Sequence, residues 1–195
     1  MSDRLQRYRS KRTGKSGEPA GKAARAAKER GNRFVIQKHD ASHLHYDFRL
    51  EVDGTLRSWA VPKGPSTTDP REKRLAVEVE DHPLDYIDFE GTIGEGNYGA
   101  GTVIVWDRGT YTNLDESRDM AASIEAGHVK FRLEGEKLRG GWTLQRTHGG
   151  EKPQWLLIKR RDADADARRN PESTQPESVQ SGRTIEEIAA GEDGS

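Results

Sequence analysis

Three of the chain's six histidines lie within seven residues of one another, in the stretch HDASHLHYDFRL that begins at His39. His45, Asp47 and Arg49 follow one another at every second position of this stretch. Side chains in a β-strand alternate between its two faces, so these three share one face and the apolar residues between them share the other. The spacing therefore predicts a strand with an apolar core face and a polar face that carries imidazole, carboxylate and guanidinium groups.

The imidazole and carboxylate groups are ligands of the type that bind divalent first-row metals. His39 ends the alternating run before His45, and a short turn between the two runs would fold it back beside His45 and Asp47. Two imidazoles and one carboxylate suit Mn, Zn or Fe, with the remaining positions open to water or substrate. The chain has no cysteine, so nitrogen and oxygen must supply every ligand. The alternative is a polar sheet face whose histidines bond one another or respond to pH; we favour the metal site.

A second polar cluster lies in EDHPLDY, residues 80–86. Proline disfavours the helical conformation of the residue before it, so His82 is expected in an extended or turn segment. His82 and Tyr86 would then leave a strand end through a tight loop, a common location for functional side chains. Taken alone, the cluster is better interpreted as an ordinary turn with a capping aspartate.

Two glycine motifs resemble nucleotide-binding loops, and both are rejected. Gly94, Gly96 and Gly99 fit the spacing G-x-G-x-x-G, but the residues after them, TVIVWD, have the pattern of a strand, whereas the dinucleotide motif opens a helix. The H-R-D and D-F-G sequences of kinases are absent. We expect a hairpin with bulges at this glycine cluster. The stretch TGKSG has Arg9 where a phosphate loop needs its first glycine, so it belongs to the basic N-terminal segment.

Period-two alternation dominates the middle of the chain and predicts the elements that must hold these side chains in place. Eight segments have this pattern: residues 33–38, 44–52, 56–61, 75–80, 101–106, 129–134, 141–146 and 155–160. Eight short strands indicate a mainly β fold, a compact barrel or a sandwich, with one or two short helices. Helical periodicity is seen at residues 22–30, 115–126 and, weakly, 185–190, with Asp115 or Ser117 as the expected cap of the second helix and Gly127 as its end.

Composition and charge divide the chain into three parts. Only 31% of the 195 residues are hydrophobic and 33% are charged, so a small core with long polar ends is expected. Residues 1–33 carry 11 Lys and Arg against 3 Asp and Glu, a net charge of +8, and residues 162–195 carry a net charge of −6. We predict a flexible basic arm over residues 1–33, a barrel or sandwich domain over residues 34–161 and an acidic, low-complexity linker or tail over residues 162–195. Both tails are expected to be disordered, because the C-terminal composition cannot bury enough surface to order itself.

The basic arm suits the phosphate backbone of a nucleic acid, which it could neutralise without reading the base sequence. A solvated arm that only adds solubility explains the charge equally well. No segment is long and apolar enough to span a membrane, and no N-terminal signal segment is evident, so a cytoplasmic protein is expected.

Two long stretches carry a closer resemblance. FVIQKHDASHLHYDFRLEVDGTLRSWAVPKGPS and KRLAVEVEDHPLDYIDFEGTIGEGNYGAGTVIVWDRGTY resemble the 3'-phosphoesterase domain of bacterial DNA ligase D, an end-joining ligase. The resemblance runs from about Phe34 to Arg160. It implies a compact β-barrel and a Mn-dependent enzyme that removes a 3'-terminal ribonucleoside from a DNA primer-template and then the remaining 3'-phosphate, leaving a 3'-hydroxyl. It also implies an end-joining ligase, a polymerase and Ku proteins as partners.

The resemblance assigns roles to individual residues. It places the family's metal ligands on the three residues that the spacing already selects, His39, His45 and Asp47. It places phosphate-binding and catalytic positions on Arg49, His82 and Tyr86, and so gives the second polar cluster a functional interpretation. Supporting contacts to phosphate or DNA fall on Glu18, Gln37, Lys63 and Arg74.

Two features near the ends of the chain bear on the same resemblance. The family usually has an aspartate where this chain has Thr13. The stretch SVQSGRTIEEIAAG is similar to the connector that leads into the ligase domain of the larger protein, whereas the nucleotidyl-lysine motif K-x-D-G of that ligase is absent from this chain.

Two alternatives from other classes remain open. His45 and Asp47, joined by a distant His128 or His148, would imitate the facial triad of a non-haem Fe(II) oxygenase. A DNA-end-binding module that has kept the barrel but lost its chemistry is the other. The position of His39 and the phosphate-binding arginines argue against the oxygenase, and the intact set of polar residues argues against the binding module.

Overall fold

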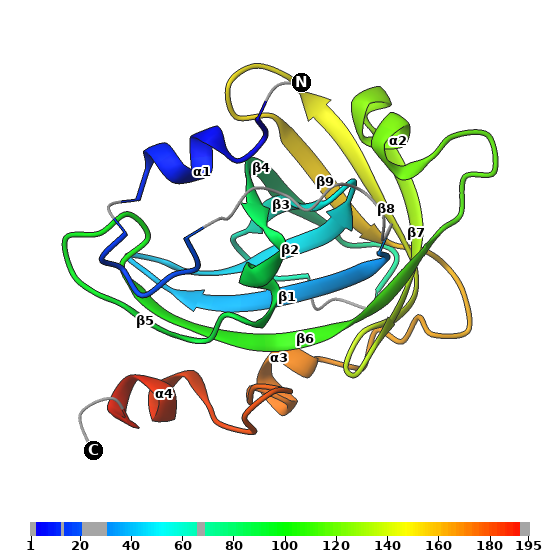
Figure 1. Ribbon diagram of the computed structural model, residues 1–195. Coiled ribbons are helices and arrows are strands. Elements are labelled where there is room, and N and C mark those ends of the chain that lie inside the picture. The colour runs from blue at the N-terminus through cyan, green and yellow to red at the C-terminus, as the bar shows by residue number, and fades with distance from the viewer. Residues whose placement is uncertain (1–2, 13, 21–30, 66–68, 192–195) are drawn as a thin grey trace.

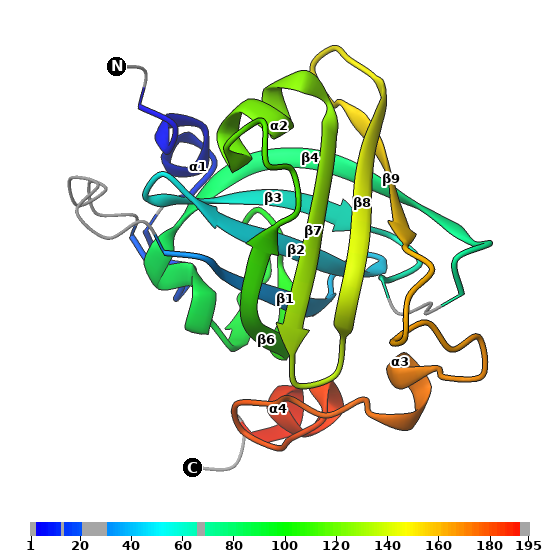
Figure 2. The same ribbon diagram turned by 90° about the vertical axis from the view of Figure 1, so that its right-hand side faces the viewer.

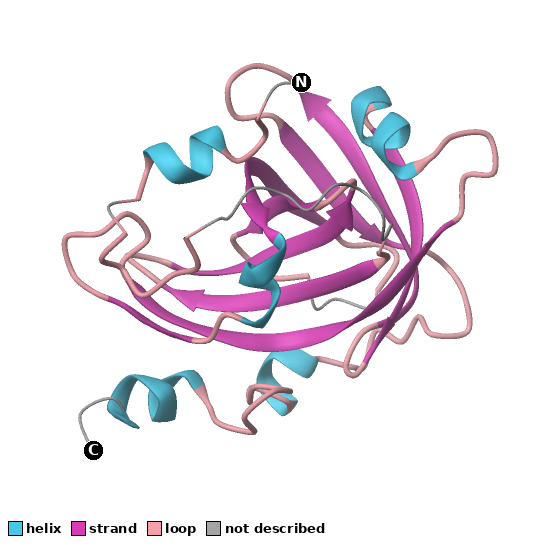
Figure 3. Ribbon diagram, viewed as in Figure 1, coloured by secondary structure: helices cyan, strands magenta, loops and turns pink. Residues whose placement is uncertain are grey.

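The computed structural model describes residues 3–12, 14–20, 31–65 and 69–191. Its main feature is a strongly curved antiparallel sheet, with short helices at its periphery (Figure 3). The strands are β1 (Arg33–Asp40), β2 (Leu44–Val52), β3 (Thr55–Val61), β4 (Lys73–Pro83), β5 (Gly91–Ile93), β6 (Gly101–Asn113), β7 (His128–Gly135), β8 (Arg139–His148) and β9 (Gln154–Lys159). The helices are α1 (Gln6–Ser10), the 3-10 helix η1 (Leu84–Asp88), α2 (Met120–Ala126), α3 (Pro171–Thr174) and α4 (Ile185–Gly191).

The sheet closes into an eight-stranded barrel. Its strands follow the order β1-β2-β3-β4-β9-β8-β7-β6, and pairing of β1 with β6 completes the ring (Figure 1). β5 lies outside the ring and forms a hairpin with the first residues of β6. All eight predicted strands are present, and the barrel rather than the sandwich is confirmed. The three-residue β5 was not predicted, although the glycine cluster after it does form the expected hairpin.

The barrel interior is packed with large side chains. Phe48 of β2 stacks on Phe131 of β7 with ring centroids 5.6 Å apart, and Trp59 meets Trp155 edge to face at 5.7 Å. All four tryptophans are fully buried. The low apolar content of the chain is therefore concentrated in one dense core, which holds the strands rigidly enough to support a site.

A second, smaller apolar cluster lies on the outer face of the barrel. It joins that face to α1 and η1 and consists of Tyr8, Val35, Leu56, Tyr86, Ile87 and Val105. In both views α1 and η1 lie on the same side of the barrel, whereas α3 and α4 lie beneath β6 (Figures 1 and 2). The outer face of β1 and β2 is thus largely covered, and the polar residues Gln37, Asp47 and Arg49 on it are buried.

Two of the three predicted helices fall in the described residues. The helix expected over residues 115–126 begins later, because Asp119 rather than Asp115 or Ser117 caps it, accepting a hydrogen bond from the Ala122 N–H at 2.8 Å. Gly127 ends it as predicted, with φ at 79°. α4 confirms the third helix, and the helix expected over residues 22–30 lies outside the described residues. α1, η1 and α3 were not predicted.

The C-terminal segment was expected to be disordered, but residues 162–191 make ordered contacts with the barrel. Lys137 Nζ and Trp106 Nε1 both donate hydrogen bonds to the Gln175 carbonyl, at 2.8 and 2.9 Å. Ile185 and Ile188 of α4 pack against Ile104 of β6. Composition indicates what a segment can bury by itself, and here the barrel supplies the buried surface. The domain boundaries at residues 33 and 161 remain predictions.

None of the helices in the described part of the chain has the length and apolar character needed to cross a bilayer.

Candidate active site

The three candidate metal ligands converge at the end of the β1–β2 hairpin. His39 and His45 are directly paired across the two strands, and Asp47 follows two residues later on the same face of β2. Their imidazole nitrogens and carboxylate oxygen lie within 4.8 Å of one another. Asp47 Oδ2 is 3.2 Å from His45 Nε2 and 3.5 Å from His39 Nδ1. The turn between the strands thus brings His39 back beside His45, as the spacing predicted.

Backbone carbonyls orient both imidazole rings. His39 Nε2–H donates to the Gly99 carbonyl at 2.7 Å, and His45 Nδ1–H donates to the His43 carbonyl at 3.1 Å. Because a carbonyl only accepts, each ring carries a hydrogen on its outer nitrogen, and its other nitrogen faces Asp47 and donates to it when the imidazole is protonated. Outer hydrogen bonds of this kind are typical of histidines that bind metals.

The charges of the triad also suit a cation. Burial raises the pKa of Asp47, but the positive charge of Arg49 and hydrogen bonds from His39 and His45 outweigh it, so the pKa lies well below its usual value. Burial lowers the pKa of His45, and the hydrogen bond to Asp47 outweighs it in turn, so this pKa is raised. Asp47 is therefore ionised, and a divalent metal would replace the proton that it draws toward His45. The donor set fits a first-row metal ion.

Hydrogen bonds to buried side chains hold Arg49 beside the triad. Its Nε donates to Gln37 Oε1 at 2.7 Å and its Nη1 to Ser58 Oγ at 2.9 Å. Gln37 is held in turn by the carbonyls of Tyr86 and Phe89. The remaining nitrogen, Nη2, is 3.6 Å from Asp47 Oδ2. The guanidinium is thus preorganised, with one edge fixed and the other directed at the candidate metal site.

His82 and Tyr86 also reach this place, so the interpretation of residues 80–86 as an ordinary turn was wrong. β4 continues through Pro83, and η1 follows immediately and carries Tyr86 back over the sheet. The two rings meet edge to face with centroids 4.7 Å apart. The guanidinium of Arg49 lies 4.9 Å from the centroid of the Tyr86 ring.

His82 is neutral in this arrangement. Its Nδ1–H donates to the Glu80 carbonyl at 2.9 Å, and its Nε2 accepts from Arg12 Nη2 at 3.3 Å, since a guanidinium only donates. Burial, followed by the positive charges of Arg49 and Arg12, holds the pKa of His82 well below its usual value. In the free protein its Nε2 therefore acts as an acceptor.

The N-terminal segment closes one side of the site. Arg12 pairs with Glu18 at 3.2 Å and with Glu80 at 3.4 Å. Glu18 also accepts the hydrogen bond of the Tyr86 hydroxyl at 2.8 Å. Arg12 and Glu80 were not among the predicted site residues. Arg12 lies in a basic run with ten other Lys and Arg residues, and nothing local distinguishes it.

These side chains surround one cavity of about 310 Å³. Residues from five parts of the fold line it: Arg12 and Glu18 of the N-terminal segment, His39, His45, Asp47 and Arg49 of the β1–β2 hairpin, Glu80 and His82 of β4, Tyr86 of η1, and Tyr98 and Gly99 of the loop between β5 and β6. Six predicted residues and Glu18 are thus brought together, and Gln37 lies directly beneath them.

Lys63 and Arg74 do not line this cavity. Lys63 borders a separate cavity of about 300 Å³ together with Lys38 and Glu172. Arg74 pairs with Glu72 at 3.0 Å and contacts the Lys63 carbonyl. His128 and His148, the third ligands of the oxygenase alternative, do not line the candidate site either. Thr13 lies outside the described residues.

Comparison with known proteins identifies the family. Residues 37–146 match the model of the DNA ligase D 3'-phosphoesterase domain. The chain belongs to this family. Of the site residues that the resemblance assigns, the matched segment contains all except Glu18, and the resemblance seen in the sequence is confirmed.

The relatives that this chain matches are longer proteins, and the match covers only part of each. The multifunctional non-homologous end joining protein LigD of Pseudomonas aeruginosa is 56% identical over 171 residues, which cover 86% of this chain and 20% of the relative. The corresponding proteins of Mycobacterium tuberculosis and Mycolicibacterium smegmatis are 46% and 42% identical over 158 and 170 residues. Those matches cover 80% and 83% of this chain, and 20% and 21% of the relatives. The chain therefore spans about a fifth of the length of these curated relatives.

Proposed function

We propose that this protein is a Mn-dependent DNA 3'-phosphoesterase. It removes a 3'-terminal ribonucleoside from a primer-template and then removes the remaining 3'-phosphate to leave a 3'-hydroxyl for end joining. The observation that carries the proposal is the convergence of His39, His45 and Asp47 with a fastened Arg49 in one cavity of a 3'-phosphoesterase-family barrel.

The metal would be held by His39, His45 and Asp47. When bound, it supplies Lewis-acid polarisation of a phosphate oxygen and offsets the charge that develops there. Manganese is the family's metal by resemblance, and the nitrogen and oxygen donors also admit other first-row ions.

Arg49 binds the phosphate. Its Nη2 faces the site while Gln37 and Ser58 hold the rest of the guanidinium, so little reorganisation is needed when the phosphate arrives. Tyr86, fixed through its hydroxyl to Glu18, forms the wall behind Arg49. These contacts persist as water attacks phosphorus and the bond to the leaving oxygen breaks.

His82 supplies the proton to that leaving oxygen. In the free protein it is neutral, because burial and the charges of Arg49 and Arg12 disfavour the imidazolium. A bound phosphate anion offsets both charges, so substrate binding raises the pKa of His82 and allows Nε2 to carry a proton. Arg12 would then turn from His82 toward the phosphate.

The N-terminal segment and the end-joining context complete the proposal. Its basic residues hold the DNA backbone without reading sequence, while Lys63 and Arg74, which lie outside the cavity, would contact DNA further along the strand. An end-joining ligase, a polymerase and Ku proteins are the proposed partners, in a bacterial or archaeal cytoplasm at the nucleoid.

The deciding experiment uses primer-templates that end in a single 3'-ribonucleotide or in a 3'-phosphate. We expect Mn-dependent shortening of the first and dephosphorylation of the second, read as product lengths on a denaturing gel, and loss of both in excess EDTA. Asp47→Asn serves as the inactive control. Binding of these ends without any processing would favour the DNA-end-binding module instead, and oxoglutarate turnover would favour the oxygenase.

A further inference from the structure

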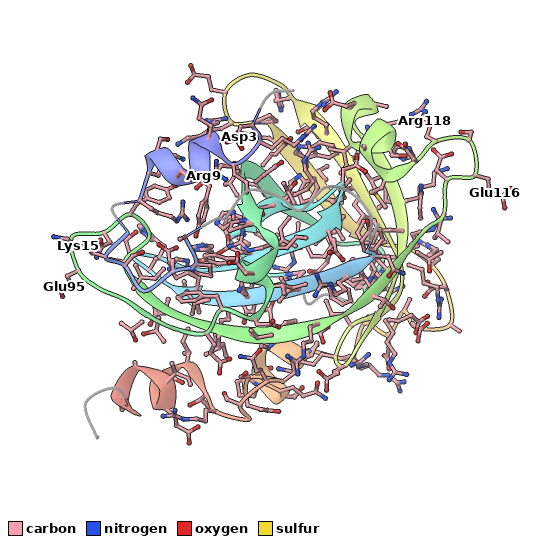
Figure 4. All side chains as sticks on the ribbon, in the orientation of Figure 1. Asp3, Arg9, Lys15, Glu95, Glu116 and Arg118 are labelled. Carbon is pink, nitrogen blue, oxygen red and sulfur yellow. The ribbon has the colours of Figure 1, made fainter. Side chains whose placement is uncertain are left out.

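The loop of residues 94–100, between β5 and β6, is a glycine-rich segment whose side chains the proposed chemistry does not use. Hydrogen bonds from the Asn97 N–H to the Gly94 carbonyl and from the Ala100 N–H to the Asn97 carbonyl shape it into consecutive turns. Glu95 at its tip points away from the barrel (Figure 4). The loop is therefore a folded projection at the edge of the barrel.

This loop is fixed to the strand that carries the metal ligands. The Gly99 carbonyl accepts the hydrogen bond from His39. Gly101, with φ at 139°, packs so tightly that a Cβ there would lie 2.1 Å from the Asp40 carbonyl oxygen. Because backbone meets backbone at this point, the C-terminal end of the loop is held against β1. Any side chain that it presents is positioned relative to His39.

The side chain presented at the cavity is Tyr98. It lines the cavity yet is 50% exposed, whereas the other four tyrosines, Tyr8, Tyr46, Tyr86 and Tyr111, are 1–5% exposed. Among the large hydrophobic side chains that are exposed in the described parts of the chain, Tyr98 is the only aromatic one. A half-exposed aromatic ring beside a phosphate site is poorly explained by core packing.

Two cations of the N-terminal segment lie over the ring. Lys11 Nζ lies 4.7 Å from the ring centroid and 3.4 Å from the hydroxyl oxygen. The guanidinium carbon of Arg12 lies 5.5 Å from the centroid. An aromatic ring combined with backbone-binding cations is the arrangement with which proteins hold single-stranded nucleic acid, since every base has a π face that can stack.

We propose that Tyr98 stacks on a nucleobase next to the scissile phosphate. This inference rests on the proposed function, because a phosphate held by Arg49 brings its attached nucleotide to the mouth of the cavity. The base belongs either to the leaving ribonucleoside or to the last retained nucleotide, and the chemistry of stacking is the same for both. Tyr98 is then the residue that recognises the nucleoside part of a substrate whose phosphate the other residues bind.

The test compares Tyr98→Ala, Tyr98→Phe and Tyr98→Leu in the full chain. Substrates are a primer-template with a 3'-ribonucleotide, the same end with an abasic leaving ribose, and the same end with an abasic last retained nucleotide. We expect Tyr98→Ala to raise KM by roughly 5- to 150-fold on the intact end, the range measured for base–aromatic stacks, while Tyr98→Phe stays near wild type. On the abasic end that removes the stacked base, Tyr98→Ala should cause no further loss.

The pattern of losses separates stacking from packing. If Tyr98 merely supports Arg12, Tyr98→Ala would lose the same factor on intact and both abasic ends, and Tyr98→Leu would rescue as well as Tyr98→Phe; either result overturns the proposal. Leu114→Ala, which removes another exposed side chain away from the cavity, is the control. Affinities for the same oligonucleotides, measured by fluorescence anisotropy, test the stack even if no end is hydrolysed, so its failure is distinguishable from failure of the proposed function.

Discussion

Strand β2 presents one face to the barrel interior and the other to the cavity under the N-terminal segment. The central side chains of both faces are almost completely buried. Phe48 and Leu50 on the inner face are 1% and 0% exposed, and Asp47 and Arg49 on the outer face are 6% and 3% exposed. The inner face needs only shape and volume, because apolar groups have no partners to lose. The outer face buries charges, and each must be matched by a specific partner.

This difference explains why the outer face suits chemistry. A buried ionisable group with fixed partners has a defined orientation and a shifted pKa, as Asp47 and His82 both do. The interior holds the strand in place, and the covered outer face supplies the preorganised polar groups. Substitutions on the two faces should therefore separate activity from stability.

Replacing a candidate metal ligand should give the largest effect. His45→Ala removes one imidazole of the triad, so kcat/KM should fall by about 10³-fold or more, because the metal contributes several kcal/mol to stabilising the transition state. The melting temperature should change little, since His45 is not in the apolar core. Activity assays with Mn titration and calorimetric metal binding would check both.

The matched control for that change is His43→Ala. His43 is exposed on the same hairpin, and only its backbone carbonyl contacts His45. Activity equal to wild type in His45→Ala, or equal losses in both variants, would contradict the assignment of the triad.

A substitution on the inner face of β2 should lower the stability of the protein rather than its activity. Phe48→Ala deletes the ring that stacks on Phe131 at the centre of the barrel. The free energy of unfolding should fall by about 3–4 kcal/mol, the usual cost of truncating a buried phenylalanine. Activity per folded molecule should remain, as measured in parallel by denaturant unfolding and by rates at low temperature. Loss of activity in a variant that stays folded would show that the two faces are not separable.

Arg49→Lys tests whether the fixed geometry of the outer face matters beyond its charge. A lysine keeps the positive charge but cannot bond Gln37, Ser58 and a phosphate from one planar group. We expect kcat/KM to fall by about 10- to 100-fold, with changes in both KM and kcat, because phosphate is held before and during the reaction. Full activity in Arg49→Lys would reduce the role of Arg49 to that of a point charge.

His82→Asn should give the smallest of the four expected effects, a change in how stability depends on pH. Burial and the charges of Arg49 and Arg12 lower the pKa of His82 in the folded protein, so below pH 6.5 the unfolded chain takes up a proton that the folded chain does not. This makes wild-type stability fall as pH decreases from 6.5. Asparagine does not titrate, so the variant should lack this part of the slope. Denaturant midpoints of both proteins between pH 5 and 8, with identical slopes, would argue against a neutral buried His82.

Much of this site could be predicted locally. The two-residue period of β2 alone put His45, Asp47 and Arg49 on one face, because alternation is a property of the extended backbone. A short turn was enough to bring back His39. The eight barrel strands followed from the same alternation, whereas β5 has only three residues and too little pattern to detect.

The rest was decided by tertiary structure. Arg12 meets His82 across 70 positions of the chain, and Glu18 meets Tyr86 across 68. A basic residue in a run of basic residues, or a histidine before a proline, has the same local pattern whether or not such a partner exists. Only closure of the barrel, with α1 and η1 packed on its outer face, brings these groups within hydrogen-bonding distance. Local alternation sets which side chains share a strand face, and long-range packing sets which of them share a site.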